Sequence, residues 1–306
     1  MFLIDGGRAV VMKLKFSASD TAADPTILFD VVLDQDEDQG GADAFFFPEG
    51  MRVVDAGEGL LVVAATSHAT IMDNTNYNYQ MAAVGLSSED GTVLWRRAYP
   101  ASNASAGFGN GAANGTMSHP YALTLAEAYT GHADDPSDDL PAGVVIAGHA
   151  YGDTTQTNFP NPVGRMLRLS REGTPLWDSR FREGNPDHNV ECYGVAPACD
   201  GGFIATCGFG CMTCDKRDTP QERTWQVLNH RTNGAGEQLW EHLYTNTSGG
   251  NNAGEFIIAR REGGYATYVD SQTWGSGDTG GNFGLLITAD DCSKGEGQSV
   301  SYAITN

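Results

Sequence analysis

Leu86-Ser-Ser-Glu-Asp-Gly-Thr-Val-Leu-Trp95 is one of three related stretches in this chain of 306 residues. The other two are Leu169-Ser-Arg-Glu-Gly-Thr-Pro-Leu-Trp177 and Arg231-Thr-Asn-Gly-Ala-Gly-Glu-Gln-Leu-Trp240, and all three contain a Gly-x-x-x-Trp motif. Asp24-Pro-Thr-Ile-Leu-Phe29 is a fainter version with Phe in place of Trp, and Gly297-Gln-Ser-Val-Ser-Tyr302 is a degenerate one. One motif that recurs at intervals of roughly 60 to 80 residues predicts a repeated structural unit.

Short apolar runs recur in phase with these motifs. Gly143-Val-Val-Ile-Ala-Gly148 and Gly202-Phe-Ile-Ala-Thr-Cys207 are examples, and each follows another apolar run. Runs of this length bounded by Gly and Asp are typical of β-strands, and an acidic-Gly pair between two of them is typical of a hairpin turn. The segment 121–129 is short enough for a helical turn, but its phase favours a strand. Each unit is therefore expected to be strand A, tight turn, strand B, long loop, strand C, tight turn and strand D, which carries the aromatic residue.

Four antiparallel strands repeated in this way predict an all-β protein, a β-propeller of four-stranded antiparallel blades. One such sheet cannot bury both of its faces alone, whereas sheets packed radially can, and the three Trp residues would fill the gaps between neighbouring blades. A solenoid of hairpins is the alternative. We expect a single domain over residues 1–306, with an N-terminal partial blade at 1–33 and four repeat units at about 51–99, 120–182, 189–244 and 254–303. Because the partial blade provides only a C–D pair, we expect an N-terminally truncated chain; alternatively, Phe2 to Ile4 also pairs in a closed ring.

The Gly-x-x-x-Trp motif and the Asp200-Gly-Gly-Phe203 start of a strand B resemble the repeats of quinoprotein-like (PQQ-type repeat) β-propellers. They are most similar to the non-enzymatic extracellular repeats of that superfamily, which implies a propeller without catalytic activity. The resemblance covers residues from about 9 to 302 as weak repeated motifs. The chain departs from the fuller consensus, because Ser87 and Asp90 stand where its Asp and Thr would be. It also lacks the vicinal Cys-Cys pair that PQQ dehydrogenases commonly use beside the cofactor.

The chain is strongly acidic, with 39 Asp and Glu against 18 Lys and Arg and a net charge of −21. This charge excludes a general nucleic-acid binder, because neutralising phosphates needs clustered Lys and Arg. It also argues against binding to anionic membranes, and no apolar run is long enough for membrane insertion. No basic segment followed by an apolar core is visible at the start, so no signal peptide is expected within this chain.

The cysteines favour an oxidising compartment. Their even number predicts disulfides among Cys192, Cys199, Cys207, Cys211, Cys214 and Cys292. Alternatively, Cys207, Cys211 and Cys214 hold a metal ion together with a ligand such as His188 or Cys192, or the thiols are free. Sequons at Asn103, Asn114 and Asn246 are candidate glycosylation sites. Together these features predict an extracellular or cell-surface protein whose signal sequence is missing from this chain.

The long B–C and D–A connections are the expected site of function, because long loops on a rigid scaffold are where binding residues concentrate. Aromatic side chains flanked by amides and hydroxyls suit a glycan or a polar protein surface, since a ring stacks on C–H groups while amides bond hydroxyls. Alternatively, these rings pack one loop onto another. The candidate binding residues are Tyr77, Tyr79, Phe108, His149, Phe159 and Trp274.

No catalytic motif stands out. The seven His show no metal-protease spacing, and neither a Gly-x-Ser-x-Gly motif nor a phosphate loop occurs. We therefore expect a non-enzymatic binding or interaction module with a protein or carbohydrate ligand and no cofactor. A quinoprotein-like oxidoreductase, or a propeller glycoside hydrolase or lyase with carboxylate catalysis, is the alternative. Ca²⁺ is a possible ligand of the acidic run 34–43, although that run departs from the EF-hand pattern and suits a solvated loop better.

Overall fold

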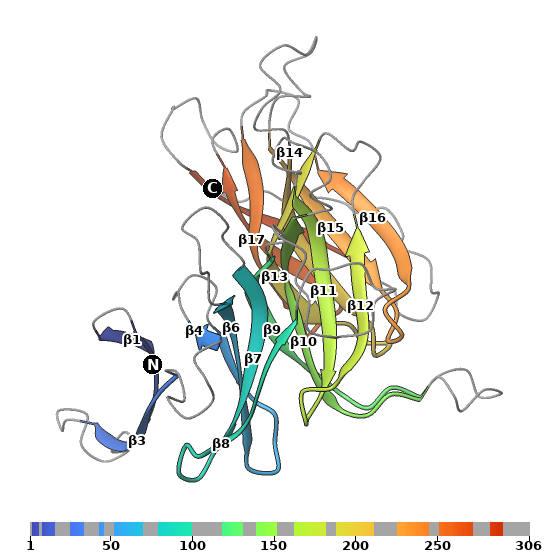
Figure 1. Ribbon diagram of the computed structural model, residues 1–306. Helices are drawn as coiled ribbons and strands as arrows, with labels where there is room; N and C mark the ends of the chain where they lie inside the picture. Colours follow the sequence, from blue (N-terminus) through green and yellow to red (C-terminus); the bar gives the residue numbers. More distant parts are fainter. Residues whose placement is uncertain are drawn as a thin grey trace.

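The computed structural model consists of β-strands joined by turns (Figure 1). It describes residues 2–5, 8–15, 25–33, 43–45, 52–69, 79–99, 118–130, 139–151, 162–181, 188–210, 225–244, 251–271 and 282–289. These residues contain no helix, and so none that could cross a membrane. All strand pairs are antiparallel, which confirms the all-β prediction.

Five sheets follow one another along the chain, and we call them sheets I to V. Sheet I comprises β1 (Phe2–Asp5), β2 (Arg8–Lys15) and β3 (Thr26–Val32). Sheet II comprises β4 (Asp43–Phe45), β5 (Arg52–Asp55), β6 (Leu60–Ala69), β7 (Tyr79–Ser87) and β8 (Val93–Tyr99), with β4 and β5 both paired to β6.

The next two sheets are regular four-stranded meanders. Sheet III comprises β9 (Ser118–Ala126), β10 (Gly143–Tyr151), β11 (Pro162–Ser170) and β12 (Pro175–Phe181). Sheet IV comprises β13 (Asn189–Pro197), β14 (Phe203–Gly210), β15 (Gln226–Thr232) and β16 (Gln238–Tyr244). Sheet V comprises β17 (Asn252–Ala259), β18 (Tyr265–Ser271) and β19 (Asn282–Thr288).

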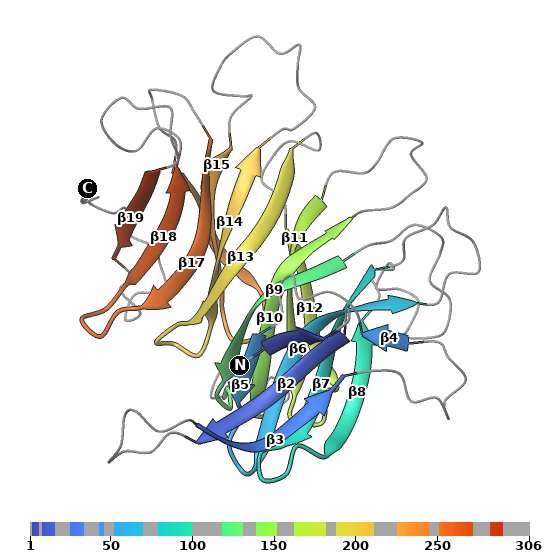
Figure 2. The same cartoon turned by 90° about the vertical axis from the view of Figure 1, so that its left-hand side faces the viewer.

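The sheets pack face to face as propeller blades (Figure 2). Alternation along a strand sends successive side chains to opposite faces, so one strand serves two interfaces. On β6, Val63 faces a cluster shared with sheet I, whereas Val62 faces a cluster shared with sheet III. Clusters of the same kind join sheet III to sheet IV and sheet IV to sheet V. The blade architecture predicted from the repeats is therefore confirmed.

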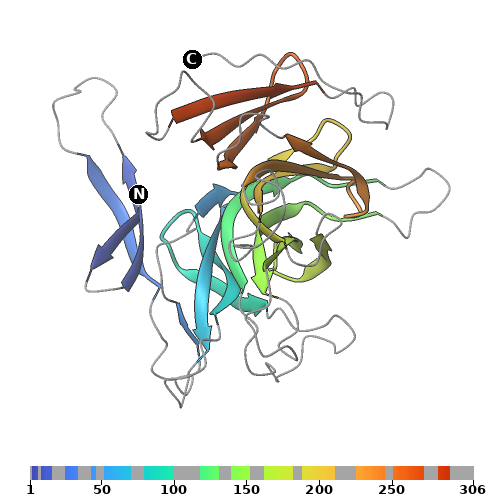
Figure 3. The same cartoon turned by 90° about the horizontal axis from the view of Figure 1, so that it is seen from above.

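The first strands of neighbouring blades lie side by side, with β9 against β13 and β13 against β17. Seen from above, the sheets succeed one another in chain order, with sheet I and sheet V at the two ends of the series (Figure 3). The segment around Tyr121, which was predicted as a strand A, is strand β9 and not a helical turn.

The repeated aromatic residue packs on the next blade, as predicted. The Trp95 ring lies against Gly173 in the β11–β12 turn, and the Trp177 ring lies against Gly236 in the β15–β16 turn. Each glycine has a positive φ (74° and 84°), and an added Cβ would lie 2.7 Å and 2.6 Å from a ring atom. Glycine is needed at these turns both for the backbone conformation and for the space. Phe29 makes the equivalent contact with Gly91.

Hydrogen bonds accompany these contacts, which we call the aromatic–glycine contacts. Trp95 Nε1 donates to Arg171 O at 2.8 Å, and Trp177 Nε1 donates to Gly234 O at 3.0 Å. Phe29 has no such donor. Lys13, which pairs with Phe29 across β2 and β3, donates from its ammonium to the carbonyl of Ser88 instead.

Two parts of the fold differ from the expectation. Sheet I is not a C–D pair alone, because β1 pairs with β2 as a third strand. The pairing of Phe2 to Ile4, which the alternative expected, is thus confirmed. A short strand, β4, also lies where a loop was expected between the first and second units. The fourth strand expected for sheet V, around residues 297–302, lies outside the described residues. The outward face of sheet V exposes several large apolar side chains, namely Phe256, Ile258, Tyr268, Phe283 and Leu285.

Candidate functional site

The starts of the first strands and the ends of the second strands lie at one end of the blades. His119 at the start of β9 is paired with His149 at the end of β10, and Ala253 at the start of β17 is paired with Asp270 near the end of β18. In an antiparallel meander, the B–C and D–A connections leave the sheet at this end. We call it the loop-bearing face, and it is the face on which the sequence places its long loops.

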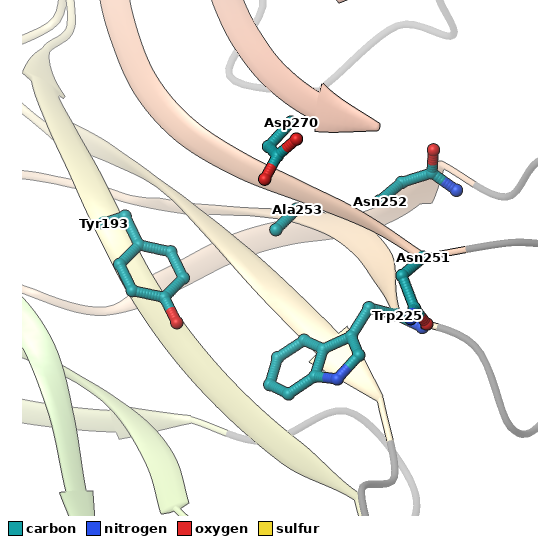
Figure 4. A pocket seen from close by; sticks show the side chains of 6 residues that line it. All are labelled: Tyr193, Trp225, Asn251, Asn252, Ala253 and Asp270. Atoms are coloured by element: carbon teal, nitrogen blue, oxygen red, sulfur yellow. The ribbon is translucent and has the colours of Figure 1, made fainter. Parts of the chain in front are cut away.

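A pocket of about 130 Å³ opens at this face between sheets IV and V (Figure 4). The carboxylate of Asp270 and the rings of Tyr193 and Trp225 point toward the same space. The pocket is lined by Tyr193, Trp225, Asn251, Asn252, Ala253 and Asp270. It thus joins two aromatic faces, amide groups and one exposed carboxylate from strands that are distant in the sequence.

Trp225 is held in place by the start of sheet V. Its backbone N–H donates to Asn251 Oδ1 at 3.0 Å, and its carbonyl accepts from the N–H of Asn252 at 2.8 Å. Its ring packs against Gly208 of β14, where an added Cβ would lie 2.6 Å from a ring carbon. These contacts fix the ring as one wall of the pocket before any ligand arrives, which reduces the ordering that binding would require.

Tyr193 forms the opposite wall and begins a row of aromatic side chains. It meets Tyr121 edge to face, with ring centroids 5.1 Å apart, and Tyr121 stacks on His149 at 5.2 Å. His119 continues the row, 5.3 Å from His149. The row crosses the boundary between sheets III and IV, so a third blade supports the pocket from the side. The Tyr193 hydroxyl donates to Glu191 Oε2 at 2.5 Å, which orients that ring.

Burial controls the charge of these groups. It lowers the pKa of His119 to about 4, and burial together with the neighbouring His119 lowers the pKa of His149 to about 3. Both imidazoles are therefore neutral at neutral pH. Burial raises the pKa of Glu255 above its ordinary value, and the charges of Asp270 and Glu191 raise it further. Burial likewise raises the pKa of Glu191, although the hydrogen bond from Tyr193 opposes this.

The electrostatic result is a negative pocket. Glu255 lies close enough to Glu191 and to Asp270 for both of their charges to act on it. Among the described residues, no Lys or Arg forms an ion pair with Glu255 or Asp270. Within the described part of the chain these two carboxylates have no compensating cation, so a positive ligand would meet a favourable potential at the pocket.

The binding residues predicted from sequence are only partly within the described structure. His149 lies in the aromatic row and is only 3 % exposed, so it supports neighbouring rings rather than presenting itself to solvent. Tyr79 is the first residue of β7. Tyr77, Phe108, Phe159, Trp274 and the three sequons lie outside the described residues. The acidic run proposed for Ca²⁺ does too, except for Asp43, the first residue of β4.

The sequence interpretation missed Tyr193, Trp225 and Asp270. Trp225 immediately precedes the apolar run of β15, at the end of a predicted long loop. This position was a usable signal, because such a residue is held by the strand yet lies at the loop-bearing face. Tyr193 and Asp270 gave no comparable signal, since they are ordinary strand residues whose proximity depends on how two sheets pack.

The three cysteines that the structure describes are disulfide-bonded. Cys192 on β13 and Cys207 on β14 are directly paired across the strands and joined by a disulfide. Cys199 is disulfide-bonded as well, whereas Cys211, Cys214 and Cys292 lie outside the described residues. Cys207 is therefore unavailable as a thiolate ligand. The described residues contain no group of three His, Cys, Asp or Glu side chains placed to hold a metal ion.

Comparisons with known proteins give distant structural similarity only. No protein-family model and no curated sequence matches the chain. A mutant of the apocarotenoid oxygenase of Synechocystis aligns with 99 % of this chain at 11 % identity and a TM-score of 0.43. This chain spans only 59 % of that oxygenase. BamB of Moraxella catarrhalis aligns with all of this chain and 87 % of its own, at 12 % identity and a TM-score of 0.25. We base no conclusion about function on similarities this low.

The fold and the pocket define a class rather than a particular protein. The described sheets are propeller blades, and a preformed pocket lies at their loop-bearing face.

Proposed function

We propose that this protein is a non-enzymatic β-propeller binding module that presents its loop-bearing face to a glycan or protein ligand. The observation that carries this proposal is the pocket between sheets IV and V. Its Trp225 wall is held by Gly208, Asn251 and Asn252 before any ligand binds. Rigid aromatic faces beside amides and a carboxylate are the usual composition of a site that recognises polar ligands.

We infer an extracellular or cell-surface location for this module. The disulfide between Cys192 and Cys207 supports an oxidising compartment, because cytosolic thiols are usually kept reduced. The net charge of −21 suits a protein that stays soluble at high ionic strength.

A second candidate function rests on Glu191 and Glu255. Both are half-buried carboxylates of raised pKa that lie near an exposed carboxylate, Asp270. A glycoside hydrolase or lyase requires a general acid and a general base, which are two carboxyl groups in different environments. One half-buried glutamate and the exposed Asp270 would form such a pair. The binding role is preferred because the Tyr193 hydroxyl already occupies one oxygen of Glu191.

The test is a screen of the labelled full chain on arrays of glycans and immobilised extracellular proteins, repeated with Trp225→Leu. We expect the native chain to retain at least one ligand whose binding is lost with Trp225→Leu. Glu172→Gln is the matched control, because Glu172 is an exposed residue of the β11–β12 turn, at the other end of the blades. The retained ligand is then recovered and weighed by mass spectrometry. An unchanged mass supports a binding module, whereas a cleaved ligand would establish the hydrolase or lyase.

A further inference from the structure

We propose that the pocket between sheets IV and V binds an organic ammonium group, supplied by a lysine side chain or by a small quaternary amine. This inference rests on the proposed binding function and names the chemistry of the group that the pocket recognises. It depends on two features of the described residues: facing aromatic walls and carboxylates that no cation neutralises.

The walls supply the first part of the recognition. Tyr193 and Trp225 flank the pocket from different sheets, and Trp225 is fixed by its packing on Gly208. The face of an aromatic ring attracts a cation through the negative face of its quadrupole, and Trp is the strongest of the three aromatic side chains in this role. A site with two such walls holds the alkyl groups of an ammonium ion as well as its charge.

The carboxylates supply the second part. Asp270 projects into the pocket and is exposed, so it can contact a ligand directly. Glu191 on β13 and Glu255 on β17 are half-buried, and neither has an ion-pair partner among the described residues. Burial raises the pKa of Glu255, and the charges of Asp270 and Glu191 raise it further. A bound cation would relieve this repulsion. A neutral sugar would leave that repulsion in place, which is why the observations favour a cation.

The size of the pocket limits the group that enters. A volume of about 130 Å³ corresponds to roughly four liquid water molecules. This space fits a small ammonium headgroup or the end of a lysine side chain. The remainder of the ligand would then extend over the loop-bearing face.

The experiment compares isosteric probes that differ in charge. Choline and its neutral carbon analogue 3,3-dimethylbutan-1-ol are titrated calorimetrically into the full chain. We expect choline to bind at least about tenfold more tightly, because a desolvated cation–π contact of this kind is worth on the order of a tenfold change. A second pair of probes tests whether a lysine side chain supplies the ammonium group. It compares Nα-acetyl-lysine amide, whose ε-amine is free, with the uncharged Nα-acetyl-norleucine amide. Preference for the lysine peptide over choline would indicate a protein partner, and the reverse a free amine.

Three variants locate the binding. Asp270→Asn keeps the shape of an exposed side chain and should weaken choline binding about tenfold while leaving the weak binding of the alcohol unchanged. Trp225→Leu should weaken both probes. Glu262→Gln is the matched control, since it removes one negative charge from the exposed turn at the other end of sheet V and should change nothing.

Several outcomes would overturn the inference. Equal affinity for the charged and neutral probes, no binding of any cationic probe, or choline binding that survives both Asp270→Asn and Trp225→Leu would each do so. The array screen separates this failure from failure of the binding function itself. If a glycan or an uncharged protein ligand binds the native chain and this binding is lost only with Trp225→Leu, the binding module is supported. The proposal that the pocket recognises an ammonium group is then wrong.

Discussion

Trp95 and Trp177 occupy equivalent positions, but their hydrogen bonds differ. The carbonyl of Gly234 accepts from Arg168 Nη1 at 3.0 Å as well as from Trp177. The carbonyl of Arg171 has Trp95 as its side-chain donor. Loss of the indole N–H therefore leaves one carbonyl satisfied and the other without its donor.

This difference predicts unequal effects of one substitution. We expect Trp95→Phe to lower the free energy of unfolding by about 1 kcal/mol more than Trp177→Phe, since an unsatisfied acceptor that is partly buried costs about that much. Urea denaturation of both variants measures the difference. The change in ring size is common to the two and cancels. Equal destabilisation would show that the second donor from Arg168 does not compensate.

His149 makes the stability depend on pH. Its folded pKa of about 3 lies below the ordinary value of about 6.5, so the unfolded chain binds a proton at pH values where the folded chain does not. The stability gained by keeping the ring neutral is fully present above about pH 6.5 and is lost as the pH falls toward 3. The raised pKa values of Glu191 and Glu255 act in the opposite direction.

A variant isolates the histidine contribution. Between about pH 7.5 and about pH 5, we expect His149→Gln to lose about 2 kcal/mol less stability than the native chain. Urea midpoints at the two pH values supply the measurement. Parallel losses in both chains would mean that His149 does not titrate as its burial requires.

At the scale of strands and turns, the hairpins followed from the sequence whereas the pairing of cysteines did not. Asp200 and the glycines after it predicted the β13–β14 turn, and the Asp200 carboxylate indeed accepts from Gly202 N–H at 2.9 Å. Six cysteines permit many pairings. The pairing of Cys192 with Cys207 depends on register, and a bulge beside it alters that register between Cys192 and Gly194. Local composition contains no signal for such a bulge.

The disulfide within sheet IV should stabilise it through the unfolded state. It closes a loop with a sequence separation of 15 residues, for which chain entropy predicts about 3 kcal/mol. We expect the double variant Cys192→Ala/Cys207→Ala to lose about that much, with a lower thermal midpoint. The single variants are unsuitable, because each would leave a reactive thiol. An unchanged midpoint would contradict a structural role for this bond.

The turn glycines test the aromatic–glycine contacts. Gly173 and Gly57 both have a positive φ, but an added Cβ at Gly57 meets no atom closer than 3.6 Å, whereas at Gly173 it meets the Trp95 ring. We expect Gly173→Ala to be about 1–3 kcal/mol more destabilising than Gly57→Ala, because overpacking adds to the backbone strain that both share. Chemical denaturation compares them directly, and similar losses would show that Trp95 moves aside.

Across the whole molecule, the repeat predicted which strands form but not which residues meet at the pocket. Tyr193 and Asp270 belong to different sheets, and their proximity follows from how β13 and β17 pack. Short sequence patterns predict strands and turns, because these depend on neighbouring residues. A site between blades depends on how the sheets pack, which such patterns do not encode.

Sheet V offers a whole-molecule test of which blade faces are covered. Leu286 is 1 % exposed and faces sheet IV, whereas its neighbour Leu285 is 38 % exposed on the outward face. We expect Leu286→Ala to cost about 2–5 kcal/mol and Leu285→Ala less than about 1 kcal/mol. Thermal unfolding of the two variants decides between them. A large loss with Leu285→Ala would mean that the outward face is covered in solution.

The aromatic–glycine contacts also bear on how such a chain can change over generations. At three junctions the structure shows one blade meeting the next through an aromatic residue on its last strand and a glycine in the last hairpin turn of the next blade, and both residues belong to the repeated unit itself. A duplicated unit therefore carries its own half of each new junction. Gene duplication or loss of a whole unit could lengthen or shorten the series without any compensating mutation elsewhere.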